Sequence, residues 1–157
     1  MQIDITHDIP ALNEHLTALQ QRLNGNLTPL MQAIGSVLEG STRQRFADKQ
    51  SPNGVSWAVL MPATVKAKNG RSNILVDSGD LIRSITFHAS SDSVLIGTDR
   101  PYGKYHQTGT KKANGTTKMV ARPFLGLSED DKSEIGDLIN DFLAGNLWWV
   151  IYPFGMM

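Results

Sequence analysis

The chain has 157 residues, the length of one domain, and contains no cysteine, which excludes disulfide bonds and thiolate metal sites. A chain of this length buries roughly two thirds of its unfolded surface, so it needs no covalent staple to be stable. The formal net charge at pH 7 is zero.

The charge is unevenly distributed along the sequence. Residues 41–122 carry thirteen basic and five acidic side chains, whereas residues 1–40 and 123–157 are both acidic. A basic middle between acidic ends favours head-to-tail association of copies or a surface that faces nucleic acid. Ordinary solvated helix faces give the same pattern. No secretory signal and no apolar run of the ~20 residues that a membrane span requires is expected.

The N-terminal part is predicted to hold one strand and two helices. Residues 2–6 alternate polar and apolar side chains, which indicates a strand with one buried face. Leucines recur at helical spacing over residues 12–23, and a second stripe begins after Thr28-Pro29 and continues to Phe46. Because only a short turn separates the two amphipathic helices, we expect them to pack as a helical hairpin.

The C-terminal part is predicted to add a strand pair and a final helix. Ile85–Ala89 and Val94–Gly97 read as antiparallel strands around a turn. Ser128 and Asp131 stand at the spacing of a capping box, which begins a helix that ends at Gly145. Without β-α-β alternation, the fold class is α+β: the N-terminal helical hairpin and the C-terminal helix pack on a small antiparallel β-sheet.

Residues 1–145 are predicted to form a single α+β domain, followed by an apolar C-terminal tail over residues 146–157. The tail has no charged side chain and contains four large aromatic residues: Trp148, Trp149, Tyr152 and Phe154. Such a surface promotes association when it is exposed. Three interpretations stay open: a last strand of its own domain, a segment that docks on a neighbouring copy by strand addition, or a cloning or frameshift remnant.

The segment from Tyr102 to Ser128 holds a loop, residues 109–122, that has basic side chains and no acid. A long loop in a compact domain is usually functional, and this one suggests an anionic partner or a contact surface. Its cations could neutralise phosphates, and Tyr102 and Tyr105 could stack on bases. The candidate assembly or DNA-facing residues are Lys104, Lys111, Lys112, Lys118 and Arg122. No helix-turn-helix, RNA-recognition or zinc-finger signature accompanies them.

Catalytic and metal-binding patterns are weak. The four histidines have no metal-ligand spacing, and His106 is the best candidate for a polar contact. Asp77 and Asp80 could bind Mg²⁺ or act in acid–base chemistry, but Asp77-Ser78-Gly79-Asp80 reads more simply as a turn and a helix N-cap. No phosphate loop or dinucleotide fingerprint is present. The sequence therefore predicts no enzyme activity, no cofactor and no small-molecule substrate.

Several short blocks occur in a specific order. They are Arg45-Phe46; Pro52-Asn53-Gly54 with Trp57; residues 74–85 (ILVDSGDLIRSI); Ile96-Gly97-Thr98; Tyr102 to Gly109 with its His106-Gln107-x-Gly core; and residues 121–128 (ARPFLGLS). In this order the chain resembles the phage virion morphogenesis family, which includes tail-completion and Mu-like G proteins. The resemblance covers about residues 1–144, and the apolar tail departs from it.

The resemblance implies a non-enzymatic virion protein of contractile-tailed phages or prophages, assembled in the bacterial host cytoplasm. It implies a ring-forming subunit that completes or terminates the tail, or joins tail to head, with DNA passing through or near the ring. Its partners would be other tail or neck proteins. The alternative function is a sequence-independent DNA-binding accessory protein that uses the basic loop.

Four residues are predicted to anchor this loop to the domain: Trp57, Tyr105, His106 and Phe124. Trp57 and Phe124 are large side chains beside turns, so they are expected to pin loops onto the sheet. Loop residues 109–120 are expected to become ordered only against a partner.

Overall fold

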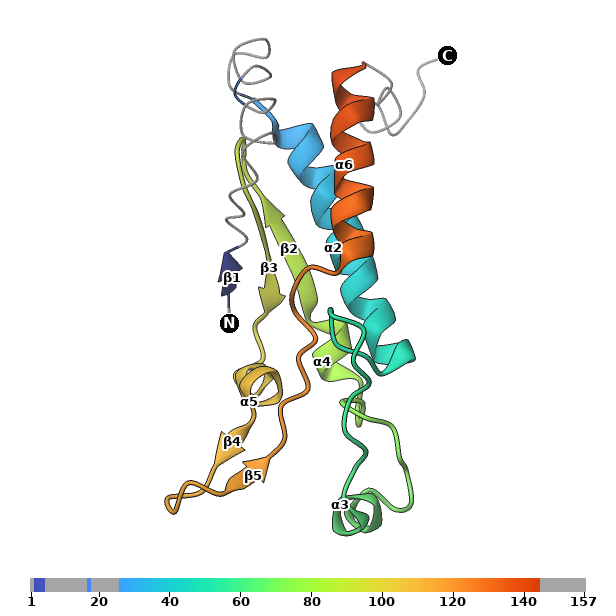
Figure 1. Cartoon of the computed structure of the whole chain (residues 1–157), viewed down its shortest axis with the longest axis vertical. Helices are drawn as coiled ribbons and strands as arrows, with labels where there is room; N and C mark the ends of the chain where they lie inside the picture. Colours follow the sequence, from blue (N-terminus) through green and yellow to red (C-terminus); the bar gives the residue numbers. More distant parts are fainter. Residues whose placement is uncertain (1, 5–16, 18–25, 145–157) are drawn as a thin grey trace.

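The computed structural model describes residues 2–4, 17 and 26–144 (Figure 1). The first predicted helix, apart from residue 17, and the apolar tail lie outside the described residues. The elements run in the order β1 (Gln2–Asp4), α2 (Thr28–Asp48), α3 (Pro62–Ala67), α4 (Asp80–Arg83), β2 (Ile85–Ala89), β3 (Val94–Thr98), α5 (Gly103–Thr108), β4 (Thr110–Lys111), β5 (Thr117–Met119) and α6 (Glu129–Leu143).

The main sheet is antiparallel, with the strand order β1-β3-β2. β2 and β3 form the predicted pair, in which Phe87 lies opposite Ile96. The turn between them is closed by the Ser90 amide, which donates to the Ser93 carbonyl at 2.8 Å. The buried side chains of Ile85 and Ile96 attach the sheet to the core. The predicted α+β class is confirmed.

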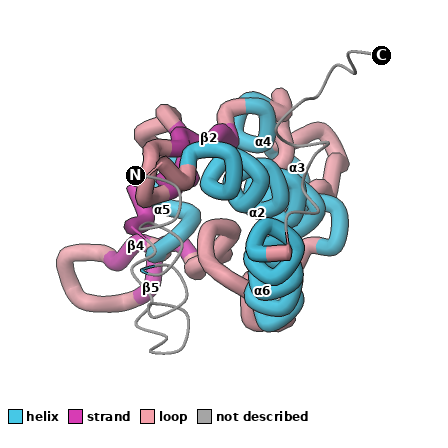
Figure 2. Tube along the Cα trace, turned by 90° about the horizontal axis from the view of Figure 1, so that it is seen from above, coloured by secondary structure: helices cyan, strands magenta, loops and turns pink. Residues whose placement is uncertain are grey.

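Helix α2 lies between the sheet and α6 (Figures 1 and 2). The sheet side of the contact depends on Gly35, because a Cβ atom there would lie 2.2 Å from Cδ2 of Phe87. The missing side chain thus lets the helix approach β2 closely. The C-terminal helix differs from the prediction, since α6 packs mainly along α2 and not on the sheet. The far side of α2 offers α6 the apolar partner it needs.

The core is centred on α2 and on an aromatic cluster at its C-terminal end. Phe46 packs edge-on against Trp57 with ring centroids 5.6 Å apart, and against Phe124 at 5.5 Å. The Trp57 indole Nε1 donates to the Pro123 carbonyl at 2.8 Å. This cluster fastens two irregular segments, one on each side of Phe46, to the end of α2.

Arg45 is buried beside this cluster and joins α2 to α6. Its guanidinium donates to the carbonyl oxygens of Phe124 and Gly126, both at 3.0 Å, and pairs with the Asp131 carboxylate. Burial lowers the pKa of Arg45, and the Asp131 charge opposes that shift. The predicted capping box is present, because the Ser128 hydroxyl accepts from the Asp131 amide at 3.0 Å and Asp131 accepts from the Ser128 amide at 2.8 Å. One carboxylate therefore caps α6 and neutralises Arg45.

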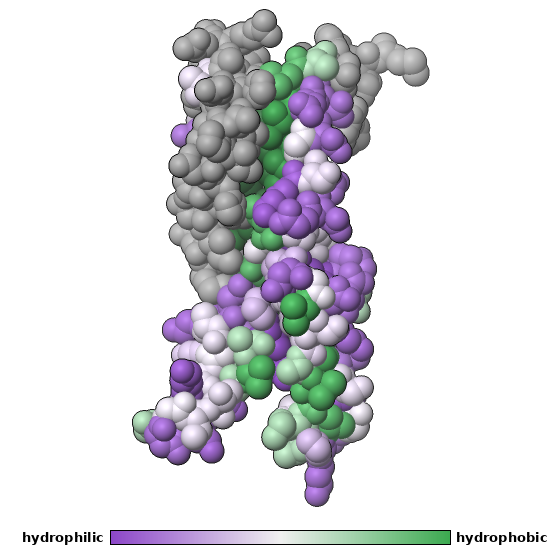
Figure 3. All heavy atoms as spheres, viewed as in Figure 1, coloured by the Kyte–Doolittle hydropathy of each residue, from purple (hydrophilic) through white to green (hydrophobic). Residues whose placement is uncertain are grey.

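Two arms extend from the lower end of the body (Figure 3). The α3 arm comprises residues 58–76, and the hairpin arm comprises residues 109–121. The hairpin arm corrects the prediction of a structureless loop, since β4 and β5 pair antiparallel and the Lys112 amide donates to the Thr116 carbonyl at 2.8 Å. Gly109 begins the hairpin with a φ of 72°, and a Cβ atom there would lie 2.7 Å from the Met119 carbonyl oxygen.

Candidate functional site: the cleft between the arms

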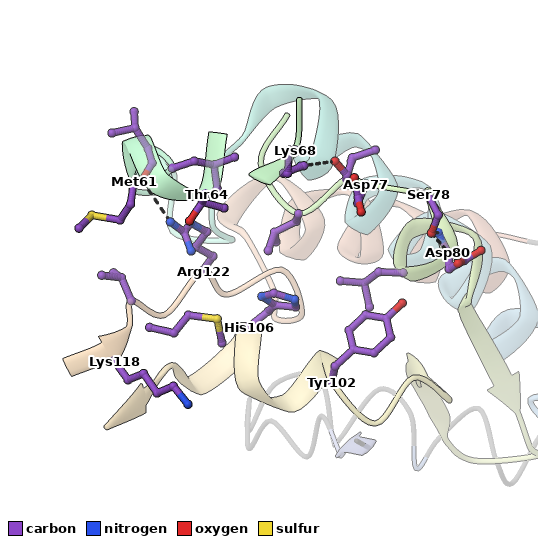
Figure 4. A pocket seen from close by; sticks show the side chains of 18 of the residues that line it. Met61, Thr64, Lys68, Asp77, Ser78, Asp80, Tyr102, His106, Lys118 and Arg122 are labelled. Carbon is purple, nitrogen blue, oxygen red and sulfur yellow. Dashed lines mark hydrogen bonds between the residues drawn. The ribbon is translucent and has the colours of Figure 1, made fainter. Parts of the chain in front are cut away.

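A cleft of about 710 Å³ lies between the two arms. Its walls come from the α3 arm, from β5 and from α5, and its floor comes from the segment Leu75–Leu81. In Figure 4, Met61 and Thr64 lie on the α3 side, and Lys118 lies on the opposite hairpin side. Leu75 adopts a φ of 58°, which is uncommon for a bulky side chain.

The α5 wall is held in place by Gln107. Its side-chain amide donates to the Leu125 carbonyl at 2.7 Å, and its carbonyl oxygen accepts from the amides of Phe124 and Leu125 at 3.0 and 3.1 Å. A side chain that pairs with the backbone in this way acts like a neighbouring strand. Gln107 therefore anchors α5 to the segment that leads into α6.

Arg122 ties the hairpin arm to the α3 arm. Its Nε donates to the Ala58 carbonyl at 2.8 Å, and its Nη2 to the Val59 carbonyl at 3.2 Å. The side chain is buried, and burial lowers its pKa. This placement corrects the prediction of Arg122 as a loop cation that faces an anionic partner, because its guanidinium already donates to carbonyl oxygens of its own chain.

Most charged groups along the floor are paired within the chain. The Lys68 ammonium donates to the carbonyls of Asn73 and Val76, both at 2.7 Å. Asp77 pairs with Arg71 at 3.0 Å, and Asp80 pairs with Arg83 at 2.7 Å. The two acids are therefore neutralised by arginines, whereas Lys68 keeps its charge and is held in place by the backbone.

The predicted acidic pair, Asp77 and Asp80, lies in a turn. Ser78 donates to the Asp80 carboxylate at 2.5 Å, and this bond and then the Arg83 bond lower the pKa of Asp80. Gly79 is the N-cap of α4, with no side-chain cap bond, which places Asp80 in its first turn. Within residues 2–4, 17 and 26–144, no group of three acidic or histidine side chains is placed to hold a metal ion.

His106 lines the cleft beside Tyr102, whose ring lies edge-on to it with centroids 6.1 Å apart. Burial and then the charge of Arg122 lower the pKa of His106, so the imidazole is neutral at pH 7. Its Nδ1 is buried and has no hydrogen-bond partner among the described residues.

The other predicted residues divide between core and surface. Trp57 and Phe124 are buried, as their anchoring role requires. Tyr105 is 46% exposed, and its ring lies next to the Lys104 ammonium, which is 5.0 Å from the ring centroid. The three lysines of the hairpin arm are exposed: Lys111, Lys112 and Lys118. The sequence did not predict that Arg122 is buried.

Exposed hydrophobic side chains gather around the cleft. Val59 is 81% exposed, Met61 71% and Val120 50%, and Tyr102 is 39% exposed. Figure 3 shows hydrophobic residues on the arm that carries α3. Single exposed apolar residues are common, but several beside one cleft indicate a contact surface.

Comparison with known proteins identifies the lineage of the chain. The sequence profile of the phage virion morphogenesis family matches residues 7–144. The chain belongs to this family. The resemblance found in the ordered sequence blocks is thereby confirmed.

Three relatives of this chain come from phages and prophages. The chain is 31% identical to the Mu-like prophage FluMu G protein 2 of Haemophilus influenzae, over 82% of this chain and 89% of the relative. It is 30% identical to FluMu G protein 1 of the same organism, over 92% and 97%. It is 29% identical to protein G of Escherichia phage Mu, whose name provisionally assigns it to capsid assembly, over 92% and 94%. No solved structure matches the chain.

Two residues that link distant segments of the chain, Gln107 and Arg45, were not predicted to do so from the sequence. Gln107 sits inside the block that carried the resemblance, and Arg45 begins the first block. Each looks like an ordinary solvated side chain, because its partners lie 17 to 86 positions away. The available signal was their place in the ordered blocks.

Proposed function

We propose that this protein is a non-enzymatic subunit that self-associates into a ring and completes or terminates a phage tail, or joins tail to head. The observation that carries the proposal is the family match over residues 7–144. The exposed apolar residues around the cleft support it, because an assembly subunit needs contact surface. The family supports a virion-associated location, and assembly would occur in the host cytoplasm. None of the described helices is long and apolar enough to cross a membrane.

A deletion of the gene in an inducible prophage tests this role. If the protein completes or joins tails, electron microscopy of the lysate should show filled heads separated from unfinished tails. A tagged copy should restore infectious particles and be recovered in them. Aberrant or missing heads with normal tails would instead place the protein in capsid assembly, the role that the name of the phage Mu relative suggests.

The alternative proposal is sequence-independent DNA binding by the hairpin arm. It is favoured by three exposed lysines on an arm that has no acidic side chain: Lys111, Lys112 and Lys118. A gel shift with duplex DNA at two salt concentrations tests it, because phosphate contacts weaken steeply with salt. Replacing the three lysines with glutamine should abolish such a shift. Particle assembly that survives this replacement would separate the DNA role from the structural role.

A further inference from the structure

We propose that the cleft between the arms binds the apolar C-terminal segment of a second copy of this chain, residues 146–157, which adds as a strand to β5. The inference rests on the proposed self-association and adds to it the site and the segment that join the copies. It requires a cleft with exposed apolar surface, an available strand edge and a tail that reaches a neighbour.

The rim of the cleft suits an apolar occupant. Arg122 and Lys68 donate to carbonyl oxygens of their own chain, and Asp80 is paired with Arg83. His106 is neutral at pH 7. The rim is instead apolar, through the exposed side chains of Val59, Met61 and Val120. The Lys118 ammonium on the hairpin side of the cleft is exposed and keeps its charge, and an apolar segment would bury the exposed apolar surface on both arms.

The strand β5 offers a pairing edge to the cleft. Among the described residues, β5 pairs with β4 alone in a two-stranded sheet. The cleft is lined by Thr117, Lys118 and Met119 of β5, and by no residue of β4. The unpaired edge of β5 therefore faces the cleft. An extended segment can add to such an edge through its backbone while its side chains fill neighbouring pockets.

The tail has the composition that this cleft requires. Residues 146–157 contain no charged side chain, and Leu147–Tyr152 reads LWWVIY, a run of aromatic, β-branched and aliphatic residues with high strand propensity. Pro153 would end such a strand because it lacks an amide donor. The six-residue run is longer than β5 itself, which spans three residues.

The position of α6 favours a second copy as the donor of the tail. Helix α6 ends at Leu143, at the opposite end of the molecule from the two arms (Figure 1). Its 15 residues rise about 22 Å, and the seven residues from Arg122 to Ser128 span up to about 23 Å more. The 13 residues after Ala144 extend at most about 47 Å. The distance that a copy's own tail would have to cover is thus up to about the length of the tail itself, while a head-to-tail neighbour brings a cleft to the tail.

Two variants separate the tail from the cleft. The first ends at Gly145 and keeps the cleft, whereas the second, V59E/M61E, keeps the tail and places two charges on the apolar rim. Both substituted side chains are more than two-thirds exposed, so the second variant should fold. The molar mass measured in solution should show that the full chain associates in a concentration-dependent way and that each variant alone is monomeric. An equimolar mixture of the two variants should form a dimer and nothing larger. V55E is the matched control, because Val55 is 61% exposed but does not line the cleft, and it should associate like the full chain.

Several results would overturn the proposal. A tail-less chain that associates like the full chain and restores phage production would exclude the tail contact and leave the assembly role standing. A full chain that is monomeric at all concentrations, with no complex in the mixture, would exclude a second copy as the occupant. Duplex DNA binding that is lost in V59E/M61E would assign the cleft to nucleic acid. The assembly role itself fails only if the deletion leaves particles intact, a separate readout.

Discussion

The buried pair of Arg45 and Asp131 should be essential for stability. The side chains are 8% and 2% exposed, and Arg45 also holds two carbonyl oxygens of the segment before α6. Replacing Arg45 with methionine leaves a buried carboxylate without its partner, which costs about 3–5 kcal/mol of unfolding free energy. For a chain of this length each kcal/mol lowers Tm by about 2–4 °C, so we expect a decrease of about 6–20 °C. Thermal and urea unfolding followed by circular dichroism measure both quantities.

The control is Arg83→Met, which removes the pair with Asp80 at the surface. Because its side chains are 66% and 50% exposed, the loss should be much smaller than for Arg45→Met. In the double variant Arg45→Met/Asp131→Asn no unpaired charge is buried, so its loss should be smaller than the sum of the two single losses by about 1–3 kcal/mol. A loss below 1 kcal/mol for Arg45→Met, or strictly additive losses, would refute the argument.

Three further predictions test other parts of the structure. Gly35→Ala should destabilise the protein by about 1–3 kcal/mol because the new methyl group meets the Phe87 ring. Gly40→Ala in the same helix has nothing within 4 Å of the new methyl group, so it should stabilise the protein by up to about 1 kcal/mol. Equal urea midpoints for the two variants would contradict the close approach of α2 to β2. Gln107→Glu replaces the amide that donates to the Leu125 carbonyl, so the free energy of unfolding should fall by about 1–3 kcal/mol, and an unchanged value would show that this bond fastens nothing. The folded-state pKa of His106 lies below its ordinary value of 6.5, so the unfolded chain takes up the proton first and the free energy of unfolding should fall as pH decreases below 6.5. His106→Gln should reduce this dependence of stability on pH. An unaltered pH dependence in the variant would assign it to other groups.

The local elements with strong patterns were predictable. The stripe after Thr28-Pro29 predicted α2, the strand pair around a turn predicted β2 and β3, and the capping box at Ser128 predicted the start of α6. In each case the signal lies within a few residues of its own structure. The helix α5 was not predicted, because six residues are too few to show a helical stripe.

The candidate site was predictable only in part. The exposed lysines of residues 109–122 and the buried Trp57 and Phe124 were expected from composition and size. The hairpin arm was not, since its strands have two and three residues and depend on the turn geometry at Gly109. The inward position of Arg122 was not expected either, because its partners are the carbonyls of Ala58 and Val59, more than sixty positions earlier.

The sequence by itself determined the fold class and the family, because periodicity, capping residues and ordered blocks are local properties of the chain. Only the tertiary structure decided which charges are free. Arg45 and Arg122 look like solvated cations in the sequence, and burial against carbonyl oxygens and a carboxylate makes them structural. The same folding brings the α3 arm and β5 together around a cleft with an apolar rim. Long-range packing sets this balance of charge, which no local pattern records.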